Sequence, residues 1–167
     1  MATALEKHPT PVSTITVWRI TSEKYADTAF SGEGAEEYGG RFNSAGTPVV
    51  YTSESISLAT LELLAKAGGR QRFSGRVVLP VTFDESQVII CGEDDLPGGW
   101  DARPYGPASQ QVGDEWIRSE KSLVLRVPSV VVPEEYNYLI NPEHPDFGEL
   151  EFGEPRPLDP DPRLPAE

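Results

Sequence analysis

One carboxylate stands in a stretch of chain that is otherwise almost entirely apolar. The stretch ISLATLELLAKAGG, residues 56–69, contains strong helix formers, has serines upstream that can cap its start, and ends in two glycines, so we predict a helix. At about 100° per residue, Glu62 lies about 40° from Leu58 on a helix that is apolar on nearly every side. Such helices are usually buried, and a buried carboxylate costs roughly several kcal/mol unless it is paired or hydrogen-bonded.

Two interpretations of Glu62 follow from this position. Its side chain either lines a cavity or points to water through a narrow polar gap. In the second case it is simply solvated or forms an ion pair with Lys66, four residues later. The pattern favours neither interpretation.

Two arginines stand in places that suit anion binding. Arg19 lies inside an apolar stretch next to Trp18, and Arg41 follows Gly39 and Gly40, where the backbone can approach a ligand closely. Because Arg gives bidentate, permanently charged contacts, two such groups can clamp a diphosphate. On spacing alone, pairing of each arginine with one of the 27 acidic residues is the more common arrangement.

Other residue types with catalytic potential give weaker signals. The stretch GEGAEE at residues 32–37 lacks the third glycine of a dinucleotide-binding loop and would turn three glutamates toward a phosphate. A Ser–His–Asp site is disfavoured because His8 and His144 both lie in proline-rich, loop-like ends. One cysteine and two distant histidines argue against structural zinc, so no residue is assigned to a metal. Four aromatic residues can stack on a flat ring, although we expect three of them in the core: Tyr51, Trp116, Tyr136 and Tyr138.

The composition indicates one acidic domain. A length of 167 residues suits a single domain, and the net charge of −13 repels phosphate backbones, so we expect no direct contact with nucleic acid. That charge suits a basic protein partner, although acidic charge that serves only solubility is more common. No apolar run approaches ~20 residues, and the N-terminus lacks the apolar core of a signal peptide. Because no long apolar run is present, we expect no membrane association. The single Cys91 allows no internal disulfide, which fits a reducing environment, so we expect a cytoplasmic location.

The positioning elements are mostly short strands in runs, which predicts the α+β class. Strands are predicted at residues 13–20, 47–53, 75–83 and 86–92, one or two strands broken near Pro128 at 122–133, and within 137–147 a strand that ends in an Asn-Pro turn. A second helix is predicted at 108–121. Between them lie a loop with a short helix at 22–40 and an acidic loop rich in Gly and Pro at 91–107. We divide the chain into a flexible leader (1–13), one domain (14–152) and an acidic, proline-rich, extended or mobile tail (153–167).

Three long segments of the chain closely resemble the RES domain family, which is named for characteristic Arg, Glu and Ser residues. They are VWRI, GGRFNSAGTPVVYTSESISLATLELL and GDEWIRSEKSLVLRVPSVVVPEEYNYLINPEHPDF. The resemblance covers roughly residues 17–147. Phe42 is a departure, because members commonly have Trp at this place, an exchange of one aromatic residue for another. Members are toxins of bacterial toxin–antitoxin pairs, with an Xre-type helix-turn-helix antitoxin.

The resemblance implies a fold similar to ADP-ribosyltransferases, with a small β-sheet core, flanking helices and a cleft for NAD⁺ as substrate rather than cofactor. It also implies cleavage of the nicotinamide–ribose bond by hydrolysis or phosphorolysis. Transfer of ADP-ribose to a specific protein is the main alternative, and a binding module without catalysis is a third possibility.

The family's functional residues match positions of this sequence one by one. The resemblance makes Glu62, Arg41 and Ser129 catalytic, and it makes Arg19, Tyr51 and Asn137 the residues that bind NAD⁺. Both arginines would bind the diphosphate, and Glu62 would stabilise the positive charge that builds on the ribose. Two assignments have near neighbours that fit the motifs less well, namely Ser119 and Ser122 beside Ser129, and Asn141 beside Asn137.

Overall fold

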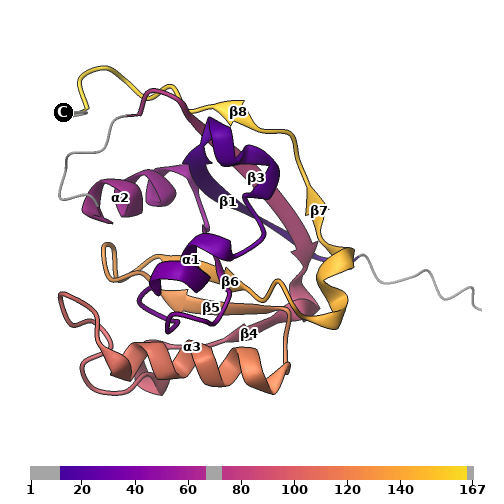
Figure 1. Ribbon diagram of the computed structural model, residues 1–167, viewed down its shortest axis with the longest axis vertical. Helices are drawn as coiled ribbons and strands as arrows, with labels where there is room; N and C mark the ends of the chain where they lie inside the picture. The colour runs from indigo at the N-terminus through magenta and orange to yellow at the C-terminus, as the bar shows by residue number, and fades with distance from the viewer. Residues whose placement is uncertain (1–11, 67–72, 165–167) are drawn as a thin grey trace, which may run out of the picture.

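The fold is built on one mixed β-sheet. The computed structural model describes residues 12–66 and 73–164. Within them, eight strands pair in the order β4-β5-β6-β2-β1-β3-β7, and β8 also pairs with β3 (Figure 1). Neighbouring strands are antiparallel except β4 and β5. The strands are β1 Thr14–Ser22, β2 Val50–Ser53, β3 Arg76–Asp84, β4 Val88–Ile90, β5 Val124–Pro128, β6 Tyr136–Ile140, β7 Glu151–Phe152 and β8 Arg156–Pro157.

Short helices connect and cover the strands. The α-helices in the described residues are α1 Glu33–Tyr38, α2 Ile56–Lys66 and α3 Pro107–Ser119, and the 3-10 helices are η1 Glu23–Thr28, η2 Glu85–Gln87, η3 Glu93–Asp95 and η4 Pro145–Glu149. The predicted α+β class is therefore confirmed, and each predicted strand and helix is present with ends shifted by a few residues. The glycines predicted to end α2 lie outside the described residues.

The sheet changes direction where β1 meets β2. Strand β1 pairs with β3 along its whole length, but it pairs with β2 only through Trp18 and Ser53. The two parts of the sheet therefore diverge at this point. Figure 1 shows β1 and β3 in the upper part of the view with α2, and β4, β5 and β6 in the lower part above α3.

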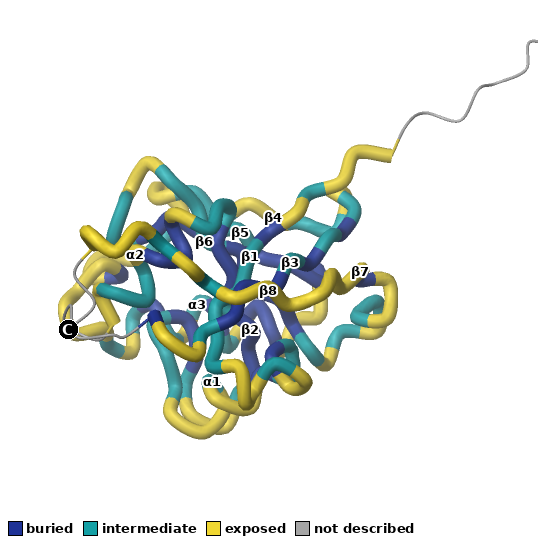
Figure 2. Tube along the Cα trace, turned by 90° about the horizontal axis from the view of Figure 1, so that it is seen from above, coloured by how far each residue is buried: buried dark blue, intermediate teal, exposed yellow. Residues whose placement is uncertain are grey.

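The core fills both faces of the sheet. Helix α3 packs Trp116 and Ile117 against Leu125, Val127 and Leu139 on one face. The other face carries a second cluster, in which η4 contributes the partly buried Phe147. Its buried members are Val17, Val50, Val81, Phe83, Leu123, Val124, Tyr138, Ile140 and Leu150. Figure 2 shows buried segments in strands such as β2 and β3, while β7 and β8 are exposed.

Helix α2 is buried on one side only, which corrects the expectation of a helix buried all round. Leu58, Ala59 and Thr60 are buried, whereas Leu61 is 43% exposed. The outer face of α2 and the segment after β8 border a shallow groove of about 540 Å³. Its helix residues lie on the face nearly opposite Glu62, so this groove is not where the acid points: Ile56, Ser57, Thr60, Leu61 and Leu64.

The described part of the acidic tail is extended and held against the domain. Val77 and Val78 of β3 pair with β8, and Gly153 N donates to Pro80 O at 3.0 Å. None of the described helices combines the length and apolar character that a bilayer crossing requires.

Candidate functional site

The Glu62 carboxylate accepts two short hydrogen bonds on one oxygen. Ser129 Oγ donates to Glu62 Oε1 at 2.7 Å, and Asn137 Nδ2 donates to the same oxygen at 2.6 Å. Ser129 follows the last residue of β5, Asn137 lies in β6, and Glu62 on α2 faces both of them. Side-chain donors to a charged acceptor therefore offset the cost of partly burying the carboxylate.

Both donors are themselves fixed in orientation. Ser129 is fully buried, and its Oγ accepts hydrogen bonds at 3.0 and 3.1 Å from the backbone N–H groups two and three residues later. Its hydroxyl proton is therefore left for Glu62. Asn137 Oδ1 accepts a hydrogen bond from Ser53 Oγ at 2.7 Å, which assigns the amide orientation and turns Nδ2 toward Glu62. The contacts of Ser129 and Asn137 thus position the acid.

The second carboxylate oxygen of Glu62 has a different environment. Oε2 accepts no hydrogen bond from the described residues, while Oε1 accepts two. Glu62 and Lys66, both described, form no ion pair. The ion pair with Lys66 that the sequence allowed is therefore not formed, and the half-buried carboxylate is instead hydrogen-bonded on one oxygen.

Arg41 lies in a tight turn whose residues form hydrogen bonds with the Tyr51 side chain. The Tyr51 hydroxyl accepts a hydrogen bond from Phe42 N at 3.0 Å and donates to Asn43 Oδ1 at 2.6 Å. Burial raises the pKa of this hydroxyl, so it remains protonated and able to donate. A Cβ at Gly40 would lie 2.7 Å from the Tyr51 hydroxyl oxygen, so the turn requires glycine there. The Tyr51 hydroxyl thus makes both of its hydrogen bonds within the turn. Stacking of the Tyr51 ring on a substrate ring stays a prediction.

Helix α3 supports the same turn from the other side. A Cβ at Gly113 would lie 1.6 Å from Phe42 O, so only glycine allows this helix to approach so closely. Gln110 Nε2 donates to two carbonyl oxygens of the turn, each at 3.2 Å. Asp114 accepts hydrogen bonds from Ser44 N at 2.9 Å and Ser44 Oγ at 2.6 Å. The backbone around Arg41 is therefore fixed by packing and hydrogen bonds from a separate element.

The Arg41 guanidinium connects this turn to the loop before α3. Its Nη1 donates to Trp100 O and Ala102 O, each at 2.9 Å. Burial lowers the pKa of Arg41; Glu62 opposes this shift, and Arg103 adds to it. Glu62 and Arg103 therefore both lie within electrostatic range of Arg41.

Arg19 reaches the same region from β1. Its Nη1 donates to Tyr51 O at 3.1 Å, while its buried Nε finds no hydrogen-bond partner among the described residues. Burial lowers the pKa of Arg19. The described residues contain an ion pair between Arg163 and Asp161, and a 4.0 Å contact between His144 and Asp146 that is an ion pair only when the histidine is protonated. The common arrangement in which each arginine pairs with an acid is therefore not met by Arg19 or Arg41.

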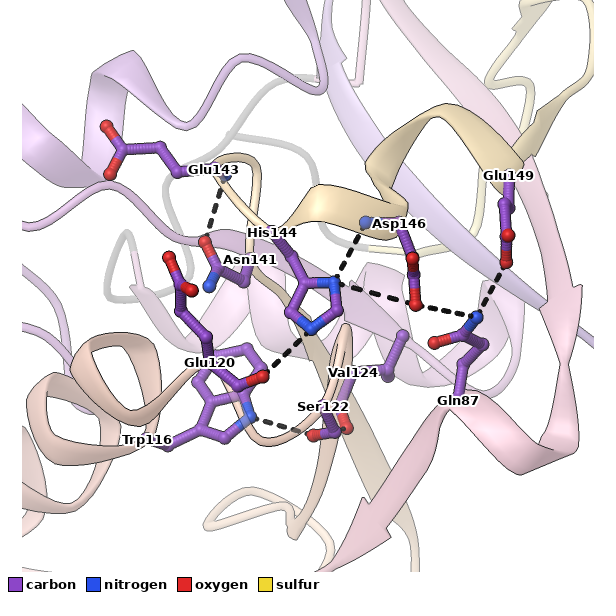
Figure 3. Close-up of polar contacts among 10 residues, drawn as sticks. All are labelled: Gln87, Trp116, Glu120, Ser122, Val124, Asn141, Glu143, His144, Asp146 and Glu149. Carbon is purple, nitrogen blue, oxygen red and sulfur yellow. Dashed lines mark hydrogen bonds and ion pairs between the residues drawn. The ribbon is translucent and has the colours of Figure 1, made fainter.

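His144 lies in a separate polar cluster (Figure 3). Its Nδ1 accepts a hydrogen bond from Asp146 N at 3.0 Å, which assigns the proton to Nε2 and makes that atom the donor to Glu120 O, also at 3.0 Å. Ser122, nearby, accepts from Trp116 Nε1 at 2.9 Å instead of contacting the histidine. The cluster joins the end of α3 to the start of η4 and contains no Ser–His–Asp arrangement.

Six predicted residues thus form one connected region. Glu62, Ser129 and Asn137 are in direct contact, Tyr51 holds the turn of Arg41, and Arg19 bonds to the backbone of Tyr51. The alternatives lie elsewhere: Ser119 Oγ donates to Trp116 O, Ser122 contacts Trp116 Nε1, and Asn141 Oδ1 accepts from Glu143 N.

Sequence reasoning missed the residues that position the site. They are Asn43, Ser53, Gln110, Gly113 and Asp114, whereas Gly40 was noted only as a place where the backbone can approach a ligand. A signal was present in α3, where Gln110, Gly113 and Asp114 are spaced three and four residues apart and therefore share one face. A glycine between two polar residues on one helix face favours close contact with another backbone.

Comparisons with known proteins bear on the family and the fold of the chain. The RES domain family matches residues 16–163. "Toxin Res" of Photorhabdus laumondii subsp. laumondii is 38% identical over 131 residues, 78% of this chain and 84% of that protein. The "Prs ADP-ribosylating toxin" of Sphingobium sp. (strain YBL2) is 38% identical over 159 residues, 90% of this chain and 97% of that protein. A chain in the crystal structure of the M. tuberculosis MbcT–MbcA toxin–antitoxin complex superposes with a TM-score of 0.73 at 17% identity, covering 88% of this chain and 85% of that one, and thus shares the fold.

Proposed function

This chain belongs to the RES domain family, and on that premise we propose that it is the toxin of a toxin–antitoxin pair and depletes NAD⁺ by cleaving the nicotinamide–ribose bond. The observation that carries the proposal is the Glu62 carboxylate, held on one oxygen by Ser129 and Asn137 and free on the other. Such an acid suits a reaction in which positive charge develops on a sugar.

The reaction breaks one C–N bond and forms one C–O bond. The bonding electron pair leaves with nicotinamide, which departs as a neutral molecule, and positive charge builds on the ribose carbon and ring oxygen. Glu62 Oε2 stabilises that charge and can hold a ribose hydroxyl. Water or phosphate then bonds to the carbon, and the acceptor's proton passes to solvent. Ser129 and Asn137 keep the carboxylate in place, so it needs no reorganisation when the charge develops.

The arginines support a diphosphate-containing substrate. Burial lowers the pKa of Arg19 and of Arg41, and neither side chain pairs with a carboxylate among the described residues. A diphosphate would supply the missing negative charge. NAD⁺ carries a diphosphate and the reacting ribose in one molecule, so it matches both parts of the site.

Product analysis tests the proposal. Purified protein, freed of any antitoxin, is incubated with NAD⁺ with and without inorganic phosphate, and the products are identified by mass spectrometry. We expect nicotinamide with ADP-ribose if water is the acceptor, or with ADP-ribose 1″-phosphate if phosphate is. Intact NAD⁺ at high protein concentration would overturn the proposal.

Transfer of ADP-ribose to a protein is the second candidate, favoured by the name of the Sphingobium relative. The same site would serve both reactions, because only the acceptor differs. A mass increase on one target protein, with label retained from adenine-labelled NAD⁺, would support transfer. Release of all the label as free ADP-ribose would exclude it.

An antitoxin is the expected partner, since an enzyme that consumes NAD⁺ freely would harm its own cell. We propose an Xre-type helix-turn-helix protein that covers the mouth of the site. The net charge of −13 would speed association with a basic, DNA-binding protein. Co-expression followed by purification tests this: we expect a stable complex without NAD⁺-cleaving activity, and a complex with full activity would contradict it.

A further inference from the structure

The loop before α3 carries an aromatic side chain that the site described above leaves without a role. Arg41 bonds to Trp100 O and Ala102 O, and Tyr105 follows three residues after the second of these carbonyls. The family resemblance gives no role to a residue of this loop, and the hydrogen bonds of Glu62 do not involve it. The loop nevertheless borders the site, because residues 100–102 lie against Arg41.

Two contacts fix the position of this loop, one at Trp100 and one at Arg103. Trp100 is 7% exposed and stacks against Phe42 with ring centroids 6.5 Å apart and planes 25° apart. Arg103 Nη2 donates to Val130 O at 3.1 Å, next to Ser129, which holds Glu62. A loop anchored to both the arginine turn and the serine turn has a defined position between them.

Tyr105 differs from the other aromatic residues around Arg41 in its exposure. Its ring centroid lies 5.8 Å from Arg41 Cζ, and the side chain is 42% exposed. Phe42 and Trp100 are buried, and the Tyr51 hydroxyl is engaged by the turn. No hydrogen bond to another described residue engages the Tyr105 hydroxyl. Of these four aromatic side chains, Tyr105 has the most open ring surface next to a diphosphate-binding group.

We propose that Tyr105, rather than Tyr51, is the residue on which a flat base of the dinucleotide substrate stacks. This inference rests on the proposed function, because it takes NAD⁺ as the ligand. Arg41 then makes two kinds of contact: its Nη1 holds the loop that carries Tyr105, and its remaining N–H groups would be left for the diphosphate. A base on Tyr105 and a phosphate on Arg41 would be neighbours, as they are in a nucleotide.

Binding and turnover together test Tyr105 as a specificity-determining residue. NAD⁺ affinity is measured by calorimetry in proteins that carry Glu62→Gln, so that cleavage does not obscure binding. Three proteins are compared: the Glu62→Gln parent with Tyr105 intact, and the same protein with Tyr105→Phe or Tyr105→Leu. We expect Tyr105→Leu to weaken binding about tenfold and Tyr105→Phe to bind within about twofold of the parent, because the aromatic face makes the contact. In the active protein the same Leu substitution should raise KM by a similar factor and leave kcat nearly unchanged. Tyr25→Leu, at a 54% exposed tyrosine on η1, is the matched control.

Two ligand fragments identify the base. If adenine stacks on Tyr105, the Leu substitution weakens AMP binding and spares nicotinamide mononucleotide; if nicotinamide stacks there, the reverse holds. Either pattern supports the proposal. Unchanged NAD⁺ affinity and KM in Tyr105→Leu, with normal turnover by the parent, would overturn it while the proposed function stands. A parent protein that neither binds nor cleaves NAD⁺ would overturn both.

Discussion

Burial lowers the pKa of Arg41, and Glu62 lies close enough to oppose part of that shift, but the protein holds the acid and the arginine by different means. Glu62 is fixed through side-chain donors on one oxygen, and these come from the ends of two strands. Arg41 sits in a turn fixed by Tyr51 and α3, and its own Nη1 is bonded to backbone carbonyls. In the proposed function, the first arrangement holds the acid in place to stabilise charge on the ribose, whereas the second holds a loop beside the diphosphate. Substitutions in the two regions should therefore affect different kinetic constants.

The largest effect is expected at Glu62. Glu62→Gln keeps the size of the side chain and an oxygen for Ser129, but it removes the negative charge, so we expect kcat to fall on the order of 10³-fold. Nicotinamide release measured by chromatography checks this. The exposed Glu115→Gln on α3 is the control and should retain full activity. A kcat within tenfold of the parent, in a Gln variant that melts at the same temperature, would mean that Glu62 acts only in binding.

The next effect is expected at Arg41. Arg41→Ala removes the bonds to two carbonyls of the opposite loop, so we expect kcat/KM to fall about 100-fold, mostly through KM. Arg41→Lys separates charge from geometry, because an ammonium group cannot reproduce the planar fork of a guanidinium. Steady-state kinetics of both variants, with the exposed Arg118→Ala as control, decide the question. Full activity in the Lys variant would show that charge alone is needed.

Gly113 tests whether α3 shapes the Arg41 turn. A methyl group there would overlap Phe42 O, so we expect Gly113→Ala to lower the free energy of unfolding by about 1–3 kcal/mol and to raise KM. Urea denaturation measures the first quantity. Gly148→Ala is the matched control, because no atom lies within 4 Å of its added Cβ, and we expect it to change stability by less than about 0.5 kcal/mol. Equal stability of the two variants would contradict the close contact.

The smallest effect is expected at Ser53, one step behind the acid. Ser53→Ala removes the hydrogen bond that orients the Asn137 amide, so we expect a loss of kcat of about three- to tenfold with little change in KM. The exposed Ser57→Ala on α2 is the control. If the Ser53 variant instead raised KM alone, the Asn137 amide would act on the substrate rather than through Glu62.

Much of the fold was predictable because it depends on local patterns. The β-rich runs gave strands β1 to β6, and the strong helix formers gave α2 and α3. The burial of α2 was not predictable from the same pattern, because it depends on how far the sheet extends beneath the helix. Leu61 remains 43% exposed as a result.

The site was predictable only in part. Apolar surroundings made Glu62 conspicuous, but its donors stand 67 and 75 residues away, a separation that no local pattern spans. The family resemblance supplied Ser129 and Asn137 as residue types without showing that both bond to Glu62 Oε1. The contacts of Tyr51 with Phe42 and Asn43 depend on the packing of the whole domain in the same way.

A crystal structure of the Glu62→Gln protein with NAD⁺ bound tests the central claim most directly, since we expect the variant to bind the substrate and to turn it over far more slowly than the parent. We predict that the nicotinamide ribose lies within hydrogen-bonding distance of residue 62, on the side of the oxygen that Ser129 and Asn137 leave free, with the diphosphate against Arg41. A nicotinamide ribose bound away from residue 62 would contradict the account.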